Sequence, residues 1–456
     1  MGKFFGTDGV RGVANTELTP ELAFYLGSGL THFVGRKNNA PEILIGMDTR
    51  RSGQMLEAAF LAGVLSAGGN VRTAGVIPTP AIAYLTRKYG LDAGVMITAS
   101  HNPFLDNGIK LYDRNGFKLG DEDEKTIEQD IMEMAGSFDI DDGAAGRSIG
   151  GEVGIKLEAE SAFRDYVEHI KSTLNGQSFE GFNVTLDCAN GAMYKAAPLL
   201  FQEIGAKTDL LASQPNGENI NLRCGSTYIR GLTAQVLKNG SCAGFAFDGD
   251  GDRCLAVDEK GNIVDGDQIL SILANHYKSK GFLHKNTLVA TVMSNMGLVK
   301  MCEDKGLHLE RTPVGDKYVL KSMVDNGYIL GGEQSGHIIN LNHSTTGEGL
   351  CTACELMAVM KETGQKLSEL ASVMEKYPQV LRNVRVSNER KSGYLASSEI
   401  TGAISALEER FEGHGRVLVR PSGTEPLVRV MIEGRDLEEI TRDAEALARL
   451  IEDILS

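Results

Sequence analysis

Three aspartates at alternate positions, Asp248, Asp250 and Asp252, follow an apolar run in the segment FAFDGDGDRCLAVDE. Like charges at this spacing repel one another, and the repulsion is small only where solvent or a cation lies between them. In an extended chain alternate residues face one side, so three carboxylate oxygens can be directed at one hard cation. Mg²⁺ commonly takes few carboxylates and fills its other positions with phosphate or water. The pattern therefore predicts a metal site with a place for a phosphoryl oxygen.

Three other interpretations of this loop stay open on the sequence alone. An EF-hand loop also begins with alternating aspartates, but Arg253 stands in place of its sixth-position glycine, and the flanking runs look like strands rather than helices. In an aspartate-nucleophile phosphatase Asp248 would be the nucleophile and Asp250 the acid/base, which leaves Asp252 without a task. A solvated acidic turn is the third interpretation, because turns favour Asp and Gly.

A second loop, TASHNP at residues 98–103, contains Ser100 as a candidate nucleophile after the apolar run AGVMI. No G-x-S-x-G elbow surrounds this serine, which disfavours an acyl hydrolase. His101 is its neighbour, but neighbouring side chains in an extended chain point apart, so the pair alone does not make a dyad. Lys110, in the strand-like DNGIKLY that follows, suits either a phosphate or proton partner or a solvated surface. The loop is equally compatible with an ordinary turn.

A third loop, GGEQSGHII at residues 331–339, has glycines on both sides of its polar residues. Such a loop can approach a ligand closely, and Glu333 and Ser335 can offer a carboxylate and a hydroxyl to sugar-like OH groups. His337 could act as an acid or a base. A tight structural turn with a hydrogen-bonding histidine is the alternative.

A fourth loop, RPSGTEP at residues 420–426, combines hydroxyls, a glycine and basic side chains. Guanidinium groups, hydroxyls and free backbone amides are the donors that bind phosphate. The candidate donors are Arg420, Ser422, Gly423, Thr424 and, further along, Arg429. The alternative is a hairpin connection made of the usual turn residues.

Apolar runs alternate with amphipathic stretches along the chain, a βα rhythm that predicts a largely parallel sheet with helices on its faces. The predicted strands are 42–48, 93–99, 182–188, 243–247 and 287–293. Several of them end in polar, glycine-bearing loops. Because ligands in α/β folds collect beyond the carboxyl ends of strands, chemistry is expected in these loops.

Breaks in this pattern divide the chain into segments 1–153, 154–255, 256–367 and 368–456. The first break is the glycine-rich, unpatterned stretch 136–154, which suits a linker. The last follows a predicted helix, KLSELASVMEKY, which leads through Pro378 into an extended run. The final segment, with two strands around RPSGTEP and a helix at 437–455, predicts a smaller α+β domain. The first three are predicted to be α/β units.

Charge and hydropathy exclude several classes of partner. A net charge of −15 makes nucleic acid an unfavourable partner, and any phosphate site must gather Lys and Arg locally against the overall field. The sequence contains no uninterrupted run of about 18 apolar residues, which argues against a membrane-spanning helix. The opening MGKFFGTDGVRG lacks the apolar core of a signal peptide, so a cytoplasmic protein is expected.

Seven irregularly spaced cysteines fit reduced thiols better than a disulfide framework. Cys351 and Cys354 form a CxxC, but the segment around them has helical periodicity. We therefore expect buried small side chains on a helix there rather than a metal or redox pair.

Together and in this order, the four loops closely resemble those of the α-D-phosphohexomutase family. The opening FFGTDGVRG and the loop GGEQSGH look like its amino-sugar branch. The resemblance runs from about residue 3 to about residue 435. It implies three related mixed α/β domains and a C-terminal α+β domain around a central cleft. One departure lies in TPVGDKYV, where this branch leads us to expect a residue other than Pro313, and Arg in place of Lys317.

The resemblance also implies roles for matching residues. Ser100 would be phosphorylated and would join Asp248, Asp250 and Asp252 in holding one Mg²⁺ per chain. The catalytic group would further include Arg11, His101 and Lys110. The implied substrate contacts are Arg253, Glu333, Ser335, His337, Arg420, Ser422, Gly423, Thr424 and Arg429.

The implied reaction interconverts glucosamine 6-phosphate and glucosamine 1-phosphate, with glucosamine 1,6-bisphosphate as intermediate and activator, and supplies amino-sugar nucleotides for the cell wall. The same chemistry on glucose or mannose phosphates is the alternative. The expected partners are the phosphosugar alone, without nucleic acid or membrane, and a homodimer is left open.

Overall fold

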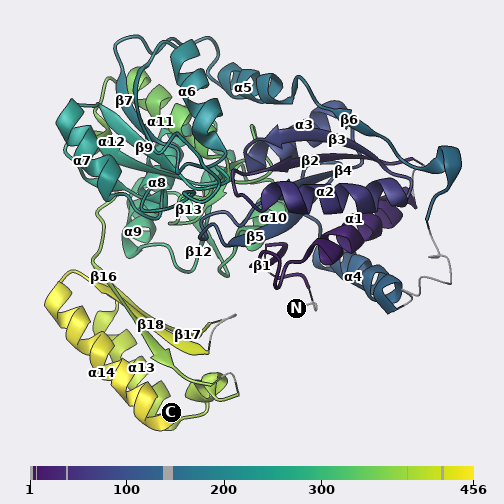
Figure 1. Cartoon of the computed structure of the whole chain (residues 1–456). Coiled ribbons are helices and arrows are strands. Elements are labelled where there is room, and N and C mark those ends of the chain that lie inside the picture. Colours follow the sequence, from purple (N-terminus) through teal and green to yellow (C-terminus); the bar gives the residue numbers. More distant parts are fainter. Residues whose placement is uncertain are drawn as a thin grey trace. The chain divides into compact units, whose positions relative to one another are not determined.

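The computed structural model describes residues 4–6, 8–36, 40–136, 147–387, 389–422 and 426–455. The chain forms two compact units. The first comprises Met1–Val292 and His308–Ser372, and the second comprises Met293–Leu307 and Val373–Ser456. Figure 1 labels the helices and strands of both. Within the described parts of the chain, no helix combines the length and the apolar character needed to cross a membrane.

The first sheet has the strand order β1-β5-β4-β2-β3-β6. Its inner strands are parallel, whereas β5 runs antiparallel to both β4 and β1. The strands are β1 (Val10–Val13), β2 (Glu42–Met47), β3 (Asn70–Val76), β4 (Ala93–Ile97), β5 (Asp106–Asp113) and β6 (Lys156–Glu158). The helices are α1 (Pro20–Gly35), α2 (Gly53–Ser66), α3 (Thr79–Tyr89) and α4 (Asp121–Gly136), and a short 3-10 turn, η1, spans Gly150–Glu152. Figure 1 shows α1 and α2 side by side.

The second sheet, in the order β11-β10-β9-β7-β8, is parallel across β8, β7 and β9 and antiparallel from β9 through β10 to β11. Its strands are β7 (Asn183–Asp187), β8 (Lys207–Leu211), β9 (Ala243–Phe247), β10 (Cys254–Asp258) and β11 (Ile263–Val264). The helices of this segment are α5 (Ala162–Thr173), α6 (Met193–Glu203) and α7 (Arg230–Asn239).

The third sheet, in the order β13-β12-β14-β15, repeats the arrangement of a parallel part with one antiparallel edge strand. Its strands are β12 (Thr287–Thr291), β13 (His308–Thr312), β14 (Leu330–Gly332) and β15 (Ile338–Asn340). The helical elements are α8 (Gly266–Ser279), η2 (His284–Asn286), α10 (Asp316–Asn326), α11 (Gly349–Thr363) and α12 (Leu367–Ala371).

The second unit is built on an antiparallel sheet in the order β16-β18-β17. Its elements are α9 (Met296–Lys305), β16 (Gln379–Arg385), η3 (Lys391–Leu395), α13 (Ser398–Phe411), β17 (Gly415–Pro421), β18 (Leu427–Gly434) and α14 (Leu437–Leu455). One face of the sheet is closed by the apolar stripe of α14, whose buried positions recur at helical spacing from Ile440 to Leu455.

The predicted fold class is confirmed: three mixed α/β sheets precede a smaller α+β part. The five predicted strands all form, most of them one or two residues shorter than expected. The predicted helix KLSELASVMEKY is wrong beyond Ala371, where α12 ends. The chain passes there from the first unit to the second, and Met374 and Tyr377 become buried in the second unit instead of continuing the helix.

Two sheets extend past the divisions expected from the sequence. Strand β6 pairs with β3 and carries the first sheet beyond residue 153. Strand β10 spans the predicted division at 255 and, by pairing with β9 and β11, carries the second sheet to Val264. Cys351 and Cys354 are buried in α11 without a disulfide, as the helical pattern predicted.

Close packing of α1 and α2 depends on two glycines that face each other's helix. A Cβ atom on Gly63 would overlap the carbonyl oxygen of Phe24, and one on Gly27 would overlap that of Phe60. We predict that Gly63→Ala forces the helices apart and lowers the free energy of unfolding by about 1–3 kcal/mol. Thermal unfolding followed by circular dichroism measures the change.

The matched control is Gly231→Ala in α7, where an added Cβ would meet open space. This variant should melt at the wild-type temperature or slightly above it, because alanine favours the helix. Equal melting temperatures for the two variants would contradict the role of Gly63.

Candidate active site

The phosphoserine candidate and the acidic loop meet at the carboxyl ends of two strands. Ser100 follows β4 of the first sheet and Asp248 follows β9 of the second, and the Ser100 Oγ donates a hydrogen bond of 2.6 Å to Asp248 Oδ2. Both residues are buried. The structure thus unites two loops that lie 148 residues apart in the chain.

Ser100 has a backbone φ of +51°, in the left-handed region that is unfavourable for residues other than glycine. Its amide donates to Thr98 Oγ1 at 2.9 Å, and its carbonyl accepts hydrogen bonds from Arg50 and Asn221 at 2.9 and 2.8 Å. These hydrogen bonds stabilise a backbone conformation that is unfavourable for a serine on its own. The serine hydroxyl is therefore fixed in direction.

Arg50 supplies most of this support. Its guanidinium is fully buried and pairs with Asp48 at 2.9 Å. It also donates hydrogen bonds to the carbonyls of Asn102 at 2.9 Å, Asp106 at 3.1 Å and Pro103. Asp48 in turn accepts from Thr98 Oγ1 at 2.7 Å. A single planar cation thus binds successive carbonyls of the serine loop, which only a group with several fixed donors can do.

The three aspartates present a metal-binding geometry. One carboxylate oxygen from each of Asp248, Asp250 and Asp252 lies within 4.8 Å of the others, and all three residues are buried. Asp250 Oδ1 and Asp252 Oδ1 are buried without a hydrogen-bond donor among the described residues. Burial raises the pKa of Asp248 well above its usual value, and the charges of Asp252 and Asp250 raise it further. Buried, unpartnered oxygens beside one another fit a divalent cation.

The structure excludes two of the alternatives that the sequence left open for this loop, the EF-hand and the solvated acidic turn. β9 and β10 pair as an antiparallel hairpin, Phe247 opposite Cys254, so the loop is no EF-hand. Its burial also excludes the solvated acidic turn. The hydrogen bond from Ser100 Oγ to Asp248 Oδ2 places the serine hydroxyl beside the aspartate cluster.

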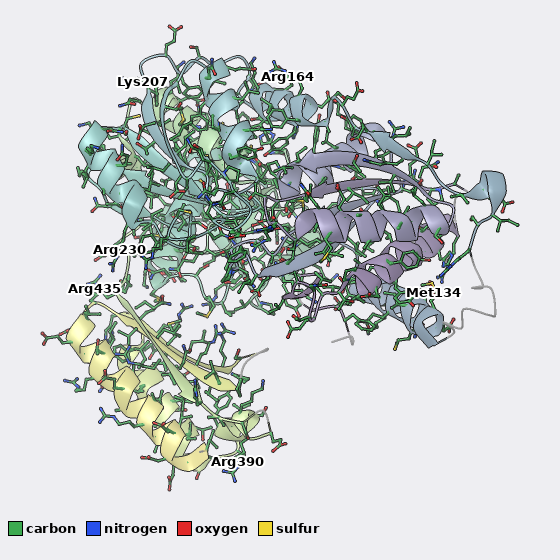
Figure 2. The ribbon with its side chains drawn as sticks, viewed as in Figure 1. Met134, Arg164, Lys207, Arg230, Arg390 and Arg435 are labelled. Carbon is green, nitrogen blue, oxygen red and sulfur yellow. The ribbon has the colours of Figure 1, made fainter. Side chains whose placement is uncertain are left out.

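Lys110 is the cation closest to the aspartates among the described residues. Its Nζ lies 2.9 Å from Asp250 Oδ2, 3.3 Å from Asp252 Oδ2 and 3.2 Å from Asp8 Oδ2, and the residue is 1% exposed. Burial by itself would lower the pKa of Lys110, but Asp250, Asp8 and Asp252 outweigh it and raise the pKa well above the ordinary value. By contrast, Arg164 and Arg230 lie at the outer surface (Figure 2).

A chain of charges extends from Lys110 toward the third sheet. Asp8 also pairs with Arg11 and with Lys118, and Lys118 pairs in turn with Asp316 at the start of α10. His337 is buried between the ends of this chain, its Nδ1 3.7 Å from Asp252 Oδ2 and its Nε2 3.7 Å from Asp316 Oδ2. Opposite charges therefore alternate across the whole centre.

His101 lies closer to the serine than sequence reasoning allowed. Its Nδ1 is 3.3 Å from Ser100 Oγ. The expectation that the neighbours point apart assumed an extended chain, whereas Ser100 is left-handed. Burial, with Arg253 and Arg11 nearby, lowers the pKa of His101 to about 4, so its ring is neutral near pH 7 and can accept a proton.

The candidate sugar loop lies between β14 and β15. Glu333 Oε1 accepts from the Gly315 amide at 3.2 Å, and Ser335 Oγ is buried without a partner among the described residues. Arg253 approaches Asp252, with 3.8 Å between Nε and Oδ1. Although burial acts to lower it, the pKa of Arg253 is raised by Asp252, Asp248 and Glu333.

In the second unit, Arg420 and Arg429 occupy directly opposed positions on β17 and β18. Burial and the neighbouring Arg429 lower the pKa of Arg420. Ser422 is buried one residue past β17. The predicted contacts Gly423 and Thr424 lie outside the described residues.

Comparison with known proteins decides the family. Sequence models of the phosphoglucomutase/phosphomannomutase family match along the chain: alpha/beta/alpha domain I at residues 2–135, domain II at 164–261, domain III at 265–377 and the C-terminal domain at 381–450. The chain belongs to this family. Its relatives include the phosphoglucosamine mutases of Ruminiclostridium cellulolyticum, 55% identical, and Caldicellulosiruptor bescii, 53% identical, each over 100% of both chains.

Solved structures share the fold of this phosphoglucomutase/phosphomannomutase family member. A family protein from Burkholderia thailandensis is 21% identical with a TM-score of 0.80, covering 99% of this chain and 97% of its own. The Aspergillus fumigatus N-acetylphosphoglucosamine mutase in complex with GlcNAc-6P and magnesium is 18% identical with a TM-score of 0.71, covering 99% and 96%.

Sequence reasoning missed several residues of this family member's centre. The missed residues are Asp8, Asp48, Arg50, Thr79, Lys118, Asn221 and Asp316. The predicted strand 42–48 leads into GMDTRRSG, one of the polar, glycine-bearing loops in which chemistry was expected, but nothing in that loop distinguished Arg50 from Arg51. The only local signal is the spacing of opposite charges two residues apart, since Arg50 folds back on Asp48.

We predict that Arg50→Lys lowers both the melting temperature and the turnover of the phosphosugar, the latter by at least about tenfold. Lysine cannot span the four carbonyls, and each buried acceptor left without a donor costs about 1–3 kcal/mol. Circular dichroism and steady-state kinetics measure the two effects. The matched control is Arg51→Lys, because the neighbouring side chain is 77% exposed. Wild-type turnover in Arg50→Lys would contradict the positioning role.

Proposed function

We propose that this chain is a phosphoglucosamine mutase that interconverts glucosamine 6-phosphate and glucosamine 1-phosphate. The observation that carries the proposal is the 2.6 Å contact between Ser100 Oγ and Asp248 within a buried aspartate triad. Full-length relatives named phosphoglucosamine mutase, 51–55% identical, support the choice of sugar. The reaction is an isomerisation achieved by two phosphoryl transfers.

In the first transfer, phospho-Ser100 gives its phosphoryl group to the free anomeric hydroxyl of glucosamine 6-phosphate. A bond forms between the sugar O1 and phosphorus, the bond between phosphorus and Ser100 Oγ breaks, and the sugar hydroxyl proton passes by way of a base to the departing Ser100 Oγ. His101 is placed for this exchange, because its neutral ring lies 3.3 Å from the serine oxygen. The product is glucosamine 1,6-bisphosphate.

In the second transfer, the bisphosphate turns over and returns its 6-phosphoryl group to Ser100. Glucosamine 1-phosphate then leaves, and the enzyme is again phosphorylated. Because the two transfers are mirror images, the same residues serve both. His101 takes the proton of the Ser100 hydroxyl and passes it to the sugar O6 as the bond between O6 and phosphorus breaks. Burial of Ser100 limits access of water to the phosphoserine.

The aspartates fit one Mg²⁺, which when bound would withdraw charge from the phosphoryl group. Three carboxylates and a dianionic phosphoserine bring about five negative charges to the site, more than one divalent cation offsets. Lys110 supplies a buried positive charge against Asp250 and Asp252, and Arg253 and Arg11 lie near His101. We propose that Arg253 and Arg11 hold the transferring phosphate.

The remaining residues are proposed to grip the rest of the substrate. Glu333, Ser335 and His337 would accept and donate hydrogen bonds at the sugar hydroxyls, since Ser335 Oγ has no partner among the described residues. The phosphate that is not reacting would be held by Arg420, Ser422, Gly423, Thr424 and Arg429. The directly opposed positions of Arg420 and Arg429 on β17 and β18 support an anion there.

A mutase acting on glucose or mannose phosphates is the second candidate, favoured by the descriptions of the family models and by the departures at Pro313 and Lys317. Relative kcat/KM values for the three sugar phosphates separate the two candidates. We further propose a cytoplasmic location, which the seven free cysteines support.

We predict that Ser100→Ala lowers turnover of glucosamine 6-phosphate by at least about a thousandfold, because the hydroxyl proposed to carry the phosphoryl group is lost. The control is Ser172→Ala, whose exposed hydroxyl bonds only its own helix. Phosphopeptide mapping after incubation with glucosamine 1,6-bisphosphate should find phosphate on Ser100. Retained turnover in Ser100→Ala, or acid-labile phosphate on Asp248, would remove the proposal.

We predict that removing divalent metal with a chelator abolishes turnover and that added Mg²⁺ restores it. Asp250→Asn should weaken Mg²⁺ binding by about 10–100-fold, because a neutral amide replaces a carboxylate ligand. Glu259→Gln is the control, since that carboxylate bonds Ser368 and lies outside the triad. Isothermal titration with Mg²⁺ measures both variants. Equal affinities would contradict the assignment of the triad as the metal site.

A further inference from the structure

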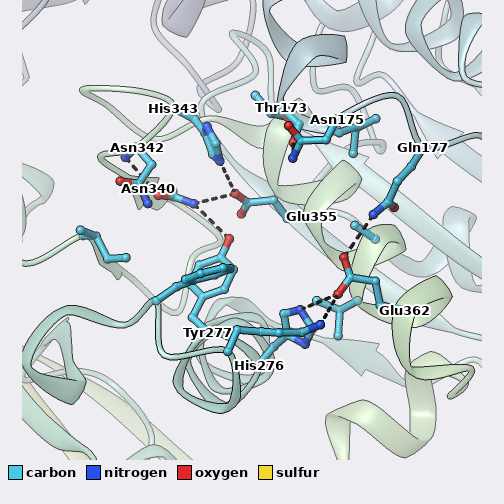
Figure 3. A pocket seen from close by; sticks show the side chains of 16 residues that line it. Thr173, Asn175, Gln177, His276, Tyr277, Asn340, Asn342, His343, Glu355 and Glu362 are labelled. Carbon is cyan, nitrogen blue, oxygen red and sulfur yellow. Dashed lines mark hydrogen bonds and ion pairs between the residues drawn. The ribbon is translucent and has the colours of Figure 1, made fainter.

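A second polar pocket, of about 400 Å³, lies in the first unit apart from the residues proposed for the mutase reaction. Figure 3 shows its walls, which come from the end of α5 and the residues after it, from α8, from the loop after β15 and from α11. Glu355, Val359 and Glu362 recur at helical spacing on α11, so they line the same side of the pocket. The two carboxylates stand two turns apart, about 10 Å along the helix.

Glu355 is a buried carboxylate that has neither Lys nor Arg beside it in the part of the chain that the structure describes. It is 8% exposed, accepts a hydrogen bond of 2.6 Å from Asn340 Nδ2 and is bonded by the Tyr277 hydroxyl. Among the described residues neither Lys nor Arg pairs with it; the group at ion-pairing distance is His343, whose Nε2 lies 3.5 Å away. Burial lowers the pKa of His343, so that ring is neutral at pH 7. Burial likewise raises the pKa of Glu355 to about 7.

Glu362, at the other end, provides the contrast. Its Oε2 pairs with Lys280 at 3.1 Å and approaches His276 at 3.2 Å, and its Oε1 accepts from Gln177 Nε2 at 3.1 Å. The protein thus balances one carboxylate of the pocket and leaves the other unbalanced. A buried carboxylate without a cation is costly in its charged form, so it either takes up a proton or is stabilised by a cation from outside.

Gln177 adds a second unsatisfied group. Its Oε1 is buried and accepts no hydrogen bond from the described residues, although its Nε2 is engaged with Glu362. An amide oxygen in this position needs an O–H or N–H donor. The pocket therefore lacks a cation at one end and a neutral donor at the other.

We propose that this pocket binds a small hydroxylated primary amine, with its ammonium group on Glu355 and a hydroxyl donated to Gln177 Oε1. The chemistry selects amines of amino-sugar size over neutral sugars, which lack the cation. Phosphorylated ligands fit poorly, because Lys280, the one lysine of the lining, is already paired with Glu362. The inference is independent of the proposed mutase reaction.

A fluorescent reporter can be placed in the pocket because the chain contains no tryptophan. Phe282 lines the pocket and is 68% exposed, so Phe282→Trp should be tolerated and yields a single reporter there. The probe is glucosamine, and glucose is its neutral match. We expect saturable fluorescence change with glucosamine and none with glucose at equal concentration. A linear diamine, putrescine, tests whether the hydroxyls matter and is expected to bind at least tenfold more weakly.

Adding Glu355→Gln to the reporter should weaken glucosamine binding by about tenfold or more, because a charge-assisted hydrogen bond is lost. Gln177→Leu, at a half-buried position, is the second variant and should weaken binding in the same direction. Circular dichroism verifies that both fold, and mutase turnover should be unchanged in both.

Tyr228→Trp, a reporter on an exposed residue outside the pocket lining, should not respond. Equal binding of glucose, preference for putrescine, an unaffected Glu355→Gln variant, or no saturable change would each overturn the proposal. Because the readout is fluorescence, a failed mutase assay leaves this result intact.

Discussion

The first unit is organised around one electrostatic constraint: three buried aspartates on one turn cannot coexist without positive charge. The protein supplies part of that charge itself through Lys110, whose ammonium group touches Asp250 and Asp252 and is 1% exposed. In a low-dielectric interior such a pair is strong, and breaking it leaves an uncompensated ion. One oxygen each of Asp250 and Asp252 accepts no hydrogen bond from the described residues, which explains why the cluster suits a divalent cation.

The serine beside this cluster is held by strain that other residues offset. A left-handed backbone at Ser100 costs free energy, on the order of 1–3 kcal/mol, and persists only where surrounding bonds over-determine it. Arg50 and Asn221 both bind the Ser100 carbonyl, one from the first sheet's segment and one from the second's. The strained geometry also brings His101 toward the serine oxygen. The strained backbone of Ser100, the buried guanidinium of Arg50 and the neutral ring of His101 therefore act together to orient the serine hydroxyl.

Local pattern in the sequence predicted the strands and the loops that carry chemistry, because each depends on residues close together in the chain or on a strand end. The union of Ser100 with the aspartates, 148 residues apart, was implied only by the family resemblance. Local pattern missed Arg50, Lys118 and Asp316, since a charged residue in a polar loop looks the same whether it is exposed or buried. Their roles arise from contacts between segments far apart, such as the 198 residues between Lys118 and Asp316. The helix beyond Ala371 failed for the same reason, because burial in another unit overrode its periodicity.

One buried segment supports both polar centres of the first unit. Asn340 and His343 line the pocket. Further along the same segment, the Gly347 amide donates to His337 Nε2 at 3.1 Å. The Gly349 amide donates to the carbonyl of Gly251, inside the aspartate loop, at 3.0 Å. Between them Thr345 Oγ1 donates to the Gly116 carbonyl at 2.5 Å. These hydrogen bonds fix the segment along its length. The side-chain amides of Asn340 and Asn342 in the pocket are therefore held by the same segment that holds His337. Selective binding of a small polar molecule requires donors and acceptors that are already held in place. The hydrogen bonds that hold this segment against the aspartate loop also hold the polar groups of the pocket in place.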